Sequence, residues 1–483
     1  MFSFSSIEDY VSALQNGETT CEDVVSHYLS VIDSNKHLNA FLEVFADEAA
    51  ARARQLDQDR NNGKPLGKLH GVVVGLKDVI AYKGHKLSAS SKILEGFTSI
   101  YNATAVDRLL QEGAIIIGRQ NCDEFAMGSS NENSAYGNVL NAADNKRVPG
   151  GSSGGSAVAV QAGMCMISLG SDTGGSVRQP ADFCGIVGLK PTYGRVSRYG
   201  LIAYASSFDQ IGIFAKSVAD AALTLEVIAG EDDFDSTASK EPVVPYSSLL
   251  NSSNYNGAAP KKIGYFKEAL EHPGLDPAIS QSFNQFLKTL TAQGYIVEPI
   301  DFELLEYIVP AYYILTTAEA SSNLSRFDGV KYGHRSAVPS EDLADFYKHN
   351  RSEGFGKEVK RRIMLGTFVL SAGYFDAYFT KAQQVRNILL KQTSAIFSRF
   401  DAIISPTVPT PAFELGSMNN DPIEMFLADI YTVFANLVGI PGISLPLFTH
   451  PNGMPFGVQV MTSHFSELAL LRISEVFLQI SEK

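Results

Sequence analysis

Two glycine- and serine-rich stretches, GGSSGGS at residues 150–156 and DTGGSVRQP at residues 172–180, lie close together in the sequence. The segment that joins them, residues 157–170, is small and apolar, which is not typical of a flexible polar linker. Glycines allow several backbone N–H groups to converge on one point, which is the geometry of an oxyanion hole. Ser176 could then attack a carbonyl group whose developing charge those N–H groups stabilise. The pattern predicts acyl transfer from an amide or an ester.

Segments of helical and strand-like periodicity alternate along the chain, which predicts an α/β fold. Residues 1–60 indicate helices, one of them begun by a capping box at Thr20 and another at residues 46–60. The β-branched run at residues 71–76 predicts a buried strand that ends at Lys77. Further elements are expected as a helix at 105–112 capped by Thr104, strands at 114–117 and 263–266, a helix at 278–293, a strand at 295–300, a helix at 375–397 and a strand at 402–405.

Residues 230–262 are rich in Asp, Ser, Asn and Pro, which indicates a surface connection or an insertion. The strands and the helix that follow it could form a subdomain or could extend a single sheet.

Composition excludes several classes of function. The 483 residues carry a formal charge of −13, so the chain lacks the basic surface with which a protein holds a phosphate backbone by itself. The N-terminus has no signal or transit pattern, and no apolar segment reaches membrane-spanning length. We therefore expect a cytoplasmic protein with no membrane association, whose nucleic-acid contacts are local or are made by a partner.

The sequence has no pattern typical of a metal or a nucleotide site. The four cysteines form no C-x-x-C pair, and we expect them to be small buried apolar residues: Cys21, Cys122, Cys165 and Cys184. A phosphate-binding P-loop and a dinucleotide fingerprint are both missing. No metal and no cofactor are therefore predicted in this chain.

A serine nucleophile needs a base, and histidine is the usual one. Residues 150–154 even match the G-x-S-x-G pattern of the α/β-hydrolases. That pattern needs a buried strand directly before its serine, whereas residues 145–149 are polar and end in a proline. A Ser-His-Asp arrangement is therefore disfavoured.

Lys77 offers a different base. At the end of an apolar strand, desolvation would lower its pKa and leave a neutral amine that can accept a proton. Alternatively, Lys77 could extend out of the strand end and pair with Asp78. The combination of a strand-end lysine with two glycine-flanked serines, Ser152 and Ser176, favours catalysis.

This combination resembles the amidase signature family. The resemblance implies a Ser-Ser-Lys triad, with Lys77 as the base, Ser152 as the bridging serine and Ser176 as the nucleophile. The oxyanion donors would be backbone N–H groups of Thr173, Gly174, Gly175 and Ser176. The implied fold is a mixed central sheet covered by helices on both faces. One domain would span residues 1–483, with a helical N-terminal segment at about 1–60, the signature core at about 65–225 and a possible α/β insertion or extension at about 260–400.

Residues 318–329, 351–362 and 439–446 resemble one branch of this family, the A subunits of tRNA-dependent amidotransferases. This resemblance implies a glutaminase whose ammonia converts misacylated Glu-tRNA(Gln), or both Glu-tRNA(Gln) and Asp-tRNA(Asn), to the amidated form. The B and C subunits of the amidotransferase would complete a heterotrimer, and the B subunit would hold the tRNA, ATP and Mg. A freestanding amidase for another small amide and an inactive scaffold remain as alternatives.

The same branch implies that Tyr312, Arg362 and Asp429 bind L-glutamine. Arg362 could grip the α-carboxylate and Asp429 could pair with the α-ammonium, while Tyr312 could add a hydrogen bond. Each residue also has an ordinary alternative. Arg362 follows two basic residues, as on a solvated helix face; Asp429 could be the polar edge of a helix; and Tyr312 could be a core residue.

Two positions depart from the family pattern. Asp182 replaces a small or neutral residue, and its charge would raise the pKa of Lys77 if it pointed inward, so we expect it to point away. Phe434-Ala435 replaces a frequent Pro-Val, which we expect to change only the local packing.

Overall fold

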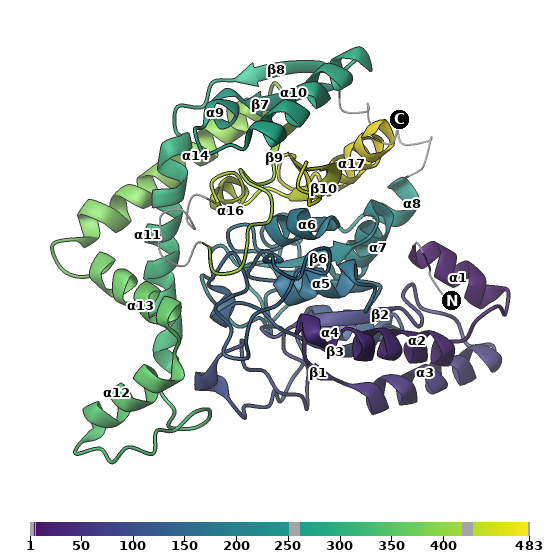
Figure 1. Ribbon diagram of the computed structural model, residues 1–483, viewed down its shortest axis with the longest axis horizontal. Coiled ribbons are helices and arrows are strands. Elements are labelled where there is room, and N and C mark those ends of the chain that lie inside the picture. The colour runs from purple at the N-terminus through teal and green to yellow at the C-terminus, as the bar shows by residue number, and fades with distance from the viewer. Residues whose placement is uncertain (1–3, 5, 251–260, 418–427, 482–483) are drawn as a thin grey trace.

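The computed structural model describes residue 4 and residues 6–250, 261–417 and 428–481. Within these residues, eleven strands form one sheet in the order β1-β3-β2-β4-β6-β5-β10-β11-β9-β7-β8 (Figure 1). Their bounds are β1 Phe41–Val44, β2 Val73–Lys77, β3 Ile115–Gln120, β4 Ile167–Ser171, β5 Val187–Lys190, β6 Ile211–Ala215, β7 Lys262–Phe266, β8 Ile296–Ile300, β9 Ala402–Pro406, β10 Gly442–Thr449 and β11 Pro455–Met461. Parallel and antiparallel pairs both occur, which confirms the predicted mixed α/β fold.

Helices cover both faces of this sheet. Their bounds are α1 Ile7–Gln15, α2 Cys21–Ser34, α3 Ala46–Asn61, α4 Thr104–Gln111, α5 Gly154–Gln161, α6 Arg178–Cys184, α7 Val218–Ile228, α8 Tyr246–Leu250, α9 Lys267–Glu271, α10 Pro277–Ala292, α11 Leu305–Asn323, α12 Leu343–Gly354, α13 Lys357–Val369, α14 Lys381–Phe397, α16 Val433–Val438 and α17 Glu467–Ser481. Helices α5 and α6 pack together on the central strands, whereas α7 packs with α4, α8 and α17. Helices α11 to α14 form a layer at the left edge of Figure 1.

Local sequence signals account for most of the early elements. Thr20 caps α2 by accepting a hydrogen bond from the N–H of Asp23, as predicted. The prediction that Thr104 caps α4 is wrong: Ala103 holds the extended cap position, and the Thr104 hydroxyl instead donates to Asp232. The short strand β1, which lies at the edge of the sheet, was not predicted within the N-terminal helices.

The later elements extend the same sheet. Strand β7 pairs in parallel with both β8 and β9, and β9 pairs with β11, so the strands that follow the surface connection continue the central sheet. Residues 251–260 of that connection lie outside the described residues. The helix expected at residues 375–397 is α14 preceded by one π-helical turn, Asp376–Thr380.

The direction of the strands places the glycine-rich stretches beside the carboxyl ends of two inner strands. Strands β2 and β4 are parallel neighbours, so their carboxyl ends, Lys77 and Ser171, lie side by side. All residues of both strands are buried. The residues after the carboxyl ends of parallel strands are where α/β proteins commonly place their binding sites. The chain continues from Ser171 directly into residues 172–177, the loop that carries Ser176.

Candidate active site

Lys77 is completely buried and is surrounded by serine hydroxyls. Its Nζ lies 2.7 Å from Ser152 Oγ, 2.8 Å from Ser153 Oγ and 2.9 Å from Ser171 Oγ. Burial lowers the pKa of Lys77 to about 8, because the charged ammonium loses its hydration. The alternative, a lysine that leaves the strand end to pair with Asp78, is wrong, because Asp78 instead pairs with Arg119 at 2.6 Å.

The two remaining triad candidates lie on the loops that precede α5 and α6. Ser152 is buried and hydrogen-bonds Lys77, whereas Ser176 is 9% exposed and its hydroxyl makes no hydrogen bond to the described residues. No histidine hydrogen-bonds either serine within the described part of the chain. No strand directly precedes Ser152, which agrees with the argument against a Ser-His-Asp arrangement.

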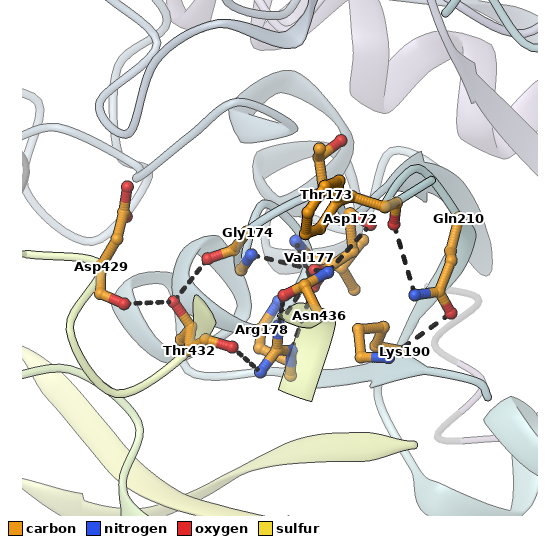
Figure 2. A network of polar contacts seen from close by, with 12 residues as sticks. Asp172, Thr173, Gly174, Val177, Arg178, Lys190, Gln210, Asp429, Thr432 and Asn436 are labelled. Carbon is orange, nitrogen blue, oxygen red and sulfur yellow. Dashed lines mark hydrogen bonds and ion pairs between the residues drawn. The ribbon is translucent and has the colours of Figure 1, made fainter. Parts of the chain in front are cut away.

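A buried ion pair holds the loop that carries Ser176. The carboxylate of Asp172 accepts from the N–H of Gly175 at 2.9 Å and from Nη2 of Arg178 at 3.0 Å, and Asn436 Nδ2 donates to it at 2.9 Å. Figure 2 shows Asp172, Arg178 and Asn436 of this network. Burial raises the pKa of Asp172, but the Arg178 guanidinium more than offsets this and lowers the pKa to about 2. Asp172 therefore stays ionised and keeps the loop in one conformation.

The loop leaves three backbone donors open. The N–H of Gly175, expected as an oxyanion donor, is instead held by Asp172. The N–H groups of Thr173, Gly174 and Ser176 make no hydrogen bond within the described residues. Gly175 has a backbone φ of +126°, which residues other than glycine rarely adopt. A Cβ on Gly174 would lie 2.4 Å from the hydroxyl of Tyr312, so glycine is needed there to let this tyrosine approach the loop.

The three residues assigned to glutamine are all buried, and they come from three separate elements. Tyr312 lies on α11 with its hydroxyl against Gly174, and Arg362 lies on α13. Arg362 Nε donates to Glu358 at 2.8 Å and its Nη1 donates to the Tyr204 hydroxyl at 2.8 Å. Arg362 is therefore not on a solvated helix face.

Asp429 lies just before α16 and accepts from two hydroxyl groups. Ser129 Oγ donates to its carboxylate at 2.9 Å, and the Tyr313 hydroxyl donates at 3.0 Å. Burial raises the pKa of Asp429 to about 6, although both hydrogen bonds oppose this change. Figure 2 shows that Thr432 joins the backbone carbonyls of Asp429 and Gly174, so the Asp429 segment is tied to the Ser176 loop.

The structure also adds residues that sequence reasoning missed. Ser153 and Asp172 stand inside the glycine-rich stretches, so their position was a usable signal. Ser129, Tyr313 and Thr432 lie far from those stretches in sequence and carried no such signal.

The two departures from the family pattern lie away from the triad. Asp182 is buried beside Thr407 and Gly457, near β9 and β11 and several strands from Lys77, which confirms that it points away. Burial raises its pKa to about 7. Phe434 packs edge-on against Phe266 at a centroid distance of 5.2 Å, a local packing role as expected.

Two further classes of feature are missing from the described residues. No helix among them is both long enough and apolar enough to span a bilayer. Within residues 6–250, 261–417 and 428–481, no three His, Cys, Asp or Glu side chains gather as a metal site. All four cysteines are buried and free, as predicted.

Comparison with known proteins identifies the family. A family model described as Amidase matches residues 23–471. The chain is 51% identical to the A subunit of the glutamyl-tRNA(Gln) amidotransferase of Pelodictyon phaeoclathratiforme over 98% of both chains. It is 50% identical to the protein of the same name from Koribacter versatilis, over 96% of this chain and 95% of that one.

Solved structures agree with the sequence matches. The A subunit of the glutamyl-tRNA(Gln) amidotransferase from Thermotoga maritima matches with a TM-score of 0.77 and 40% identity, over 94% of this chain and 90% of that one. The peptide amidase from Stenotrophomonas maltophilia matches with a TM-score of 0.81 and 29% identity, over 99% and 97%. With the matched family model, the sequence relatives and the shared fold in agreement, the chain belongs to the amidase family.

Proposed function

We propose that this chain is the glutaminase subunit of a tRNA-dependent amidotransferase. The observation that carries the proposal is the fully buried Lys77, which is hydrogen-bonded to Ser152. It lies next to a glycine-rich loop that carries Ser176 and three N–H groups without an acceptor among the described residues. Relatives that are about 50% identical are named as the A subunit of such an enzyme, and the match covers almost their whole length.

The hydroxyls around Lys77 explain how it can act as a base. Ser153 Oγ donates its proton to the carbonyl of Ser171 at 3.1 Å, so it can only accept from Lys77. A neutral amine has two N–H groups and one lone pair. If Ser153 and Ser171 accept the two N–H groups, the lone pair is left for the proton of Ser152. With a pKa of about 8, about half of Lys77 is neutral at pH 8 and about 9% at pH 7.

The reaction then proceeds in two steps. Ser176 Oγ attacks the side-chain amide carbon of glutamine, and its proton passes through Ser152 to Lys77. The N–H groups of Thr173, Gly174 and Ser176 stabilise the oxyanion; Gly175 supports them by holding the loop against Asp172. The C–N bond breaks as the proton returns to the leaving ammonia. Water, deprotonated by the same route, then hydrolyses the acyl-Ser176 ester and releases glutamate.

The charges beyond the triad fit a free amino acid better than an apolar amide. Arg362 grips the α-carboxylate and ionised Asp429 pairs with the α-ammonium, while Tyr312 closes the site over Gly174. A freestanding amidase for apolar amides has no use for two buried opposite charges.

The rest of the reaction belongs to partners. Ammonia must reach a carboxylate that has been activated, and we assign the ATP, Mg and tRNA chemistry to the B subunit, with the C subunit completing a cytoplasmic heterotrimer. We assign Glu-tRNA(Gln) as the acceptor, because the relatives that are about 50% identical are named for it.

The test is ammonia release from L-glutamine by the chain purified with its partner subunits, compared with a Ser176→Ala variant. We expect the variant to lose both ammonia release and glutamine-dependent amidation, and to regain amidation when ammonium is supplied directly. Unchanged release in the variant would refute the nucleophile, and failure of the rescue would refute the division of labour.

A further inference from the structure

Tyr313 lies between the two charged side chains assigned to glutamine. Its hydroxyl donates to Asp429 Oδ2 at 3.0 Å, and its ring lies 5.2 Å from the guanidinium carbon of Arg362. Tyr313 is 5% exposed, and its ring packs edge-on against Tyr312 at 5.1 Å. One rigid side chain on α11 therefore contacts the cation carried by α13 and the anion that precedes α16.

The guanidinium of Arg362 is fixed on its other sides. Glu358, one turn earlier on α13, accepts from Nε, and Tyr204 accepts from Nη1. A guanidinium has five N–H groups, and these two bonds leave three without a partner among the described residues. Because two of the three are on Nη2, the group keeps one edge free for a carboxylate.

Asp429 has matching spare capacity. Its carboxylate accepts from two hydroxyls, those of Ser129 and Tyr313, and a carboxylate offers about four lone-pair positions. The remaining positions can bind an ammonium group.

We propose that Tyr313 is a positioning residue that fixes the separation and the orientation of Arg362 and Asp429, and that it thereby selects amides carrying both an α-carboxylate and an α-ammonium. This inference rests on the proposed function and extends it to the basis of substrate selection. The hydroxyl orients Asp429, and the ring face holds the guanidinium by a cation–π contact. Glu358 is the second positioning residue, and of the two side chains assigned to glutamine's charges it contacts only Arg362.

A purely structural role for Tyr313 makes a different prediction. A tyrosine that only fills the core would, when altered, lower stability and the amount of active enzyme, so kcat would fall for every substrate alike. A positioning role instead changes KM for substrates that use Asp429 and leaves other substrates unaffected.

The experiment compares two amides with the enzyme complex of Tyr313→Phe, which retains the ring and removes only the hydroxyl. The amides are L-glutamine and glutaramate, which lacks the α-ammonium. We expect KM for L-glutamine to rise about tenfold with kcat within about twofold, equivalent to about 1.4 kcal/mol of binding. Values for glutaramate should stay unchanged, so the preference for glutamine falls about tenfold. The control is Tyr307→Phe, because Tyr307 lies on the same helix and is 49% exposed.

A second pair of variants covers the possibility that Tyr313→Phe folds poorly. Glu358→Ala should raise KM for both amides, because both use Arg362, and Glu358→Gln should restore much of the affinity since its carbonyl still accepts from Nε. An unchanged preference in a folded Tyr313→Phe, or a KM in Glu358→Ala that matches the wild type, would overturn the inference. Glutamine hydrolysis that persists in Ser176→Ala would instead overturn the proposed function, and this inference with it.

Discussion

The pKa of Lys77 gives a quantitative prediction for the pH dependence of the reaction. Lys77 must be neutral to accept a proton, and burial lowers its pKa to about 8. With that value, the neutral fraction is about 1% at pH 6, about 9% at pH 7 and about 90% at pH 9. The rate should therefore rise with pH, close to tenfold per unit below pH 7, and level off above pH 9.

The assay is kcat for ammonia release, measured at saturating L-glutamine from pH 6 to pH 9.5. Saturation matters because Asp429 titrates near pH 6 and affects binding. Lys190 is a second fully buried lysine, whose pKa burial lowers to about 7. A Lys190→Met variant separates the two lysines, since it should keep the inflection near pH 8. A flat profile, or an inflection that disappears in Lys190→Met, would refute Lys77 as the base.

Three other predictions concern the loop and the substrate charges. In steady-state kinetics, Arg362→Ala should raise KM for L-glutamine by tenfold or more, since a hydrogen bond to a charged group contributes about 1.5 to 3 kcal/mol. The change in kcat should be smaller. A fall in kcat with an unchanged KM would instead show that Arg362 acts only in the chemical step. Lowering the pH through about 6 protonates Asp429 and removes its charge, so KM should rise below pH 6 while an Asp429→Asn variant shows no such rise. Gly174→Ala places a Cβ 2.4 Å from the Tyr312 hydroxyl and should lower the free energy of unfolding by about 1 to 3 kcal/mol in urea titrations, with loss of activity; wild-type stability and rate would contradict the close approach.

The parts of the site that could be predicted from the sequence are those encoded locally. Lys77 follows a β-branched run, and Ser152 and Ser176 lie in glycine-rich stretches, so each had a signal within a few residues. The partners of Asp429 had none, because Ser129 and Tyr313 are brought to it only by the packing of α11 and of the loop after β3.

The two secondary-structure predictions that were wrong failed for a similar reason. Strand β1 is only four residues long and was missed because its partner, β3, lies more than seventy residues further along the chain. Threonine is a residue type typical of helix caps, but the Thr104 hydroxyl donates to Asp232, which is distant in sequence. Helix α4 therefore begins one residue earlier than expected. In both places a distant residue decided between local alternatives of similar energy.

The ion pair beneath the Ser176 loop has a consequence for how the protein acquires activity. Arg178 also donates to Asn436 Oδ1 at 2.6 Å and to the carbonyl of Thr432 at 2.8 Å, and β5 pairs with β10. Two of the residues that support this loop, Thr432 and Asn436, thus follow Ser176 by more than 250 positions in the chain. A nascent chain that has already produced Lys77, Ser152 and Ser176 still lacks the supports of its loop. We therefore expect the chain to hydrolyse glutamine only once the C-terminal strands have taken their places in the sheet.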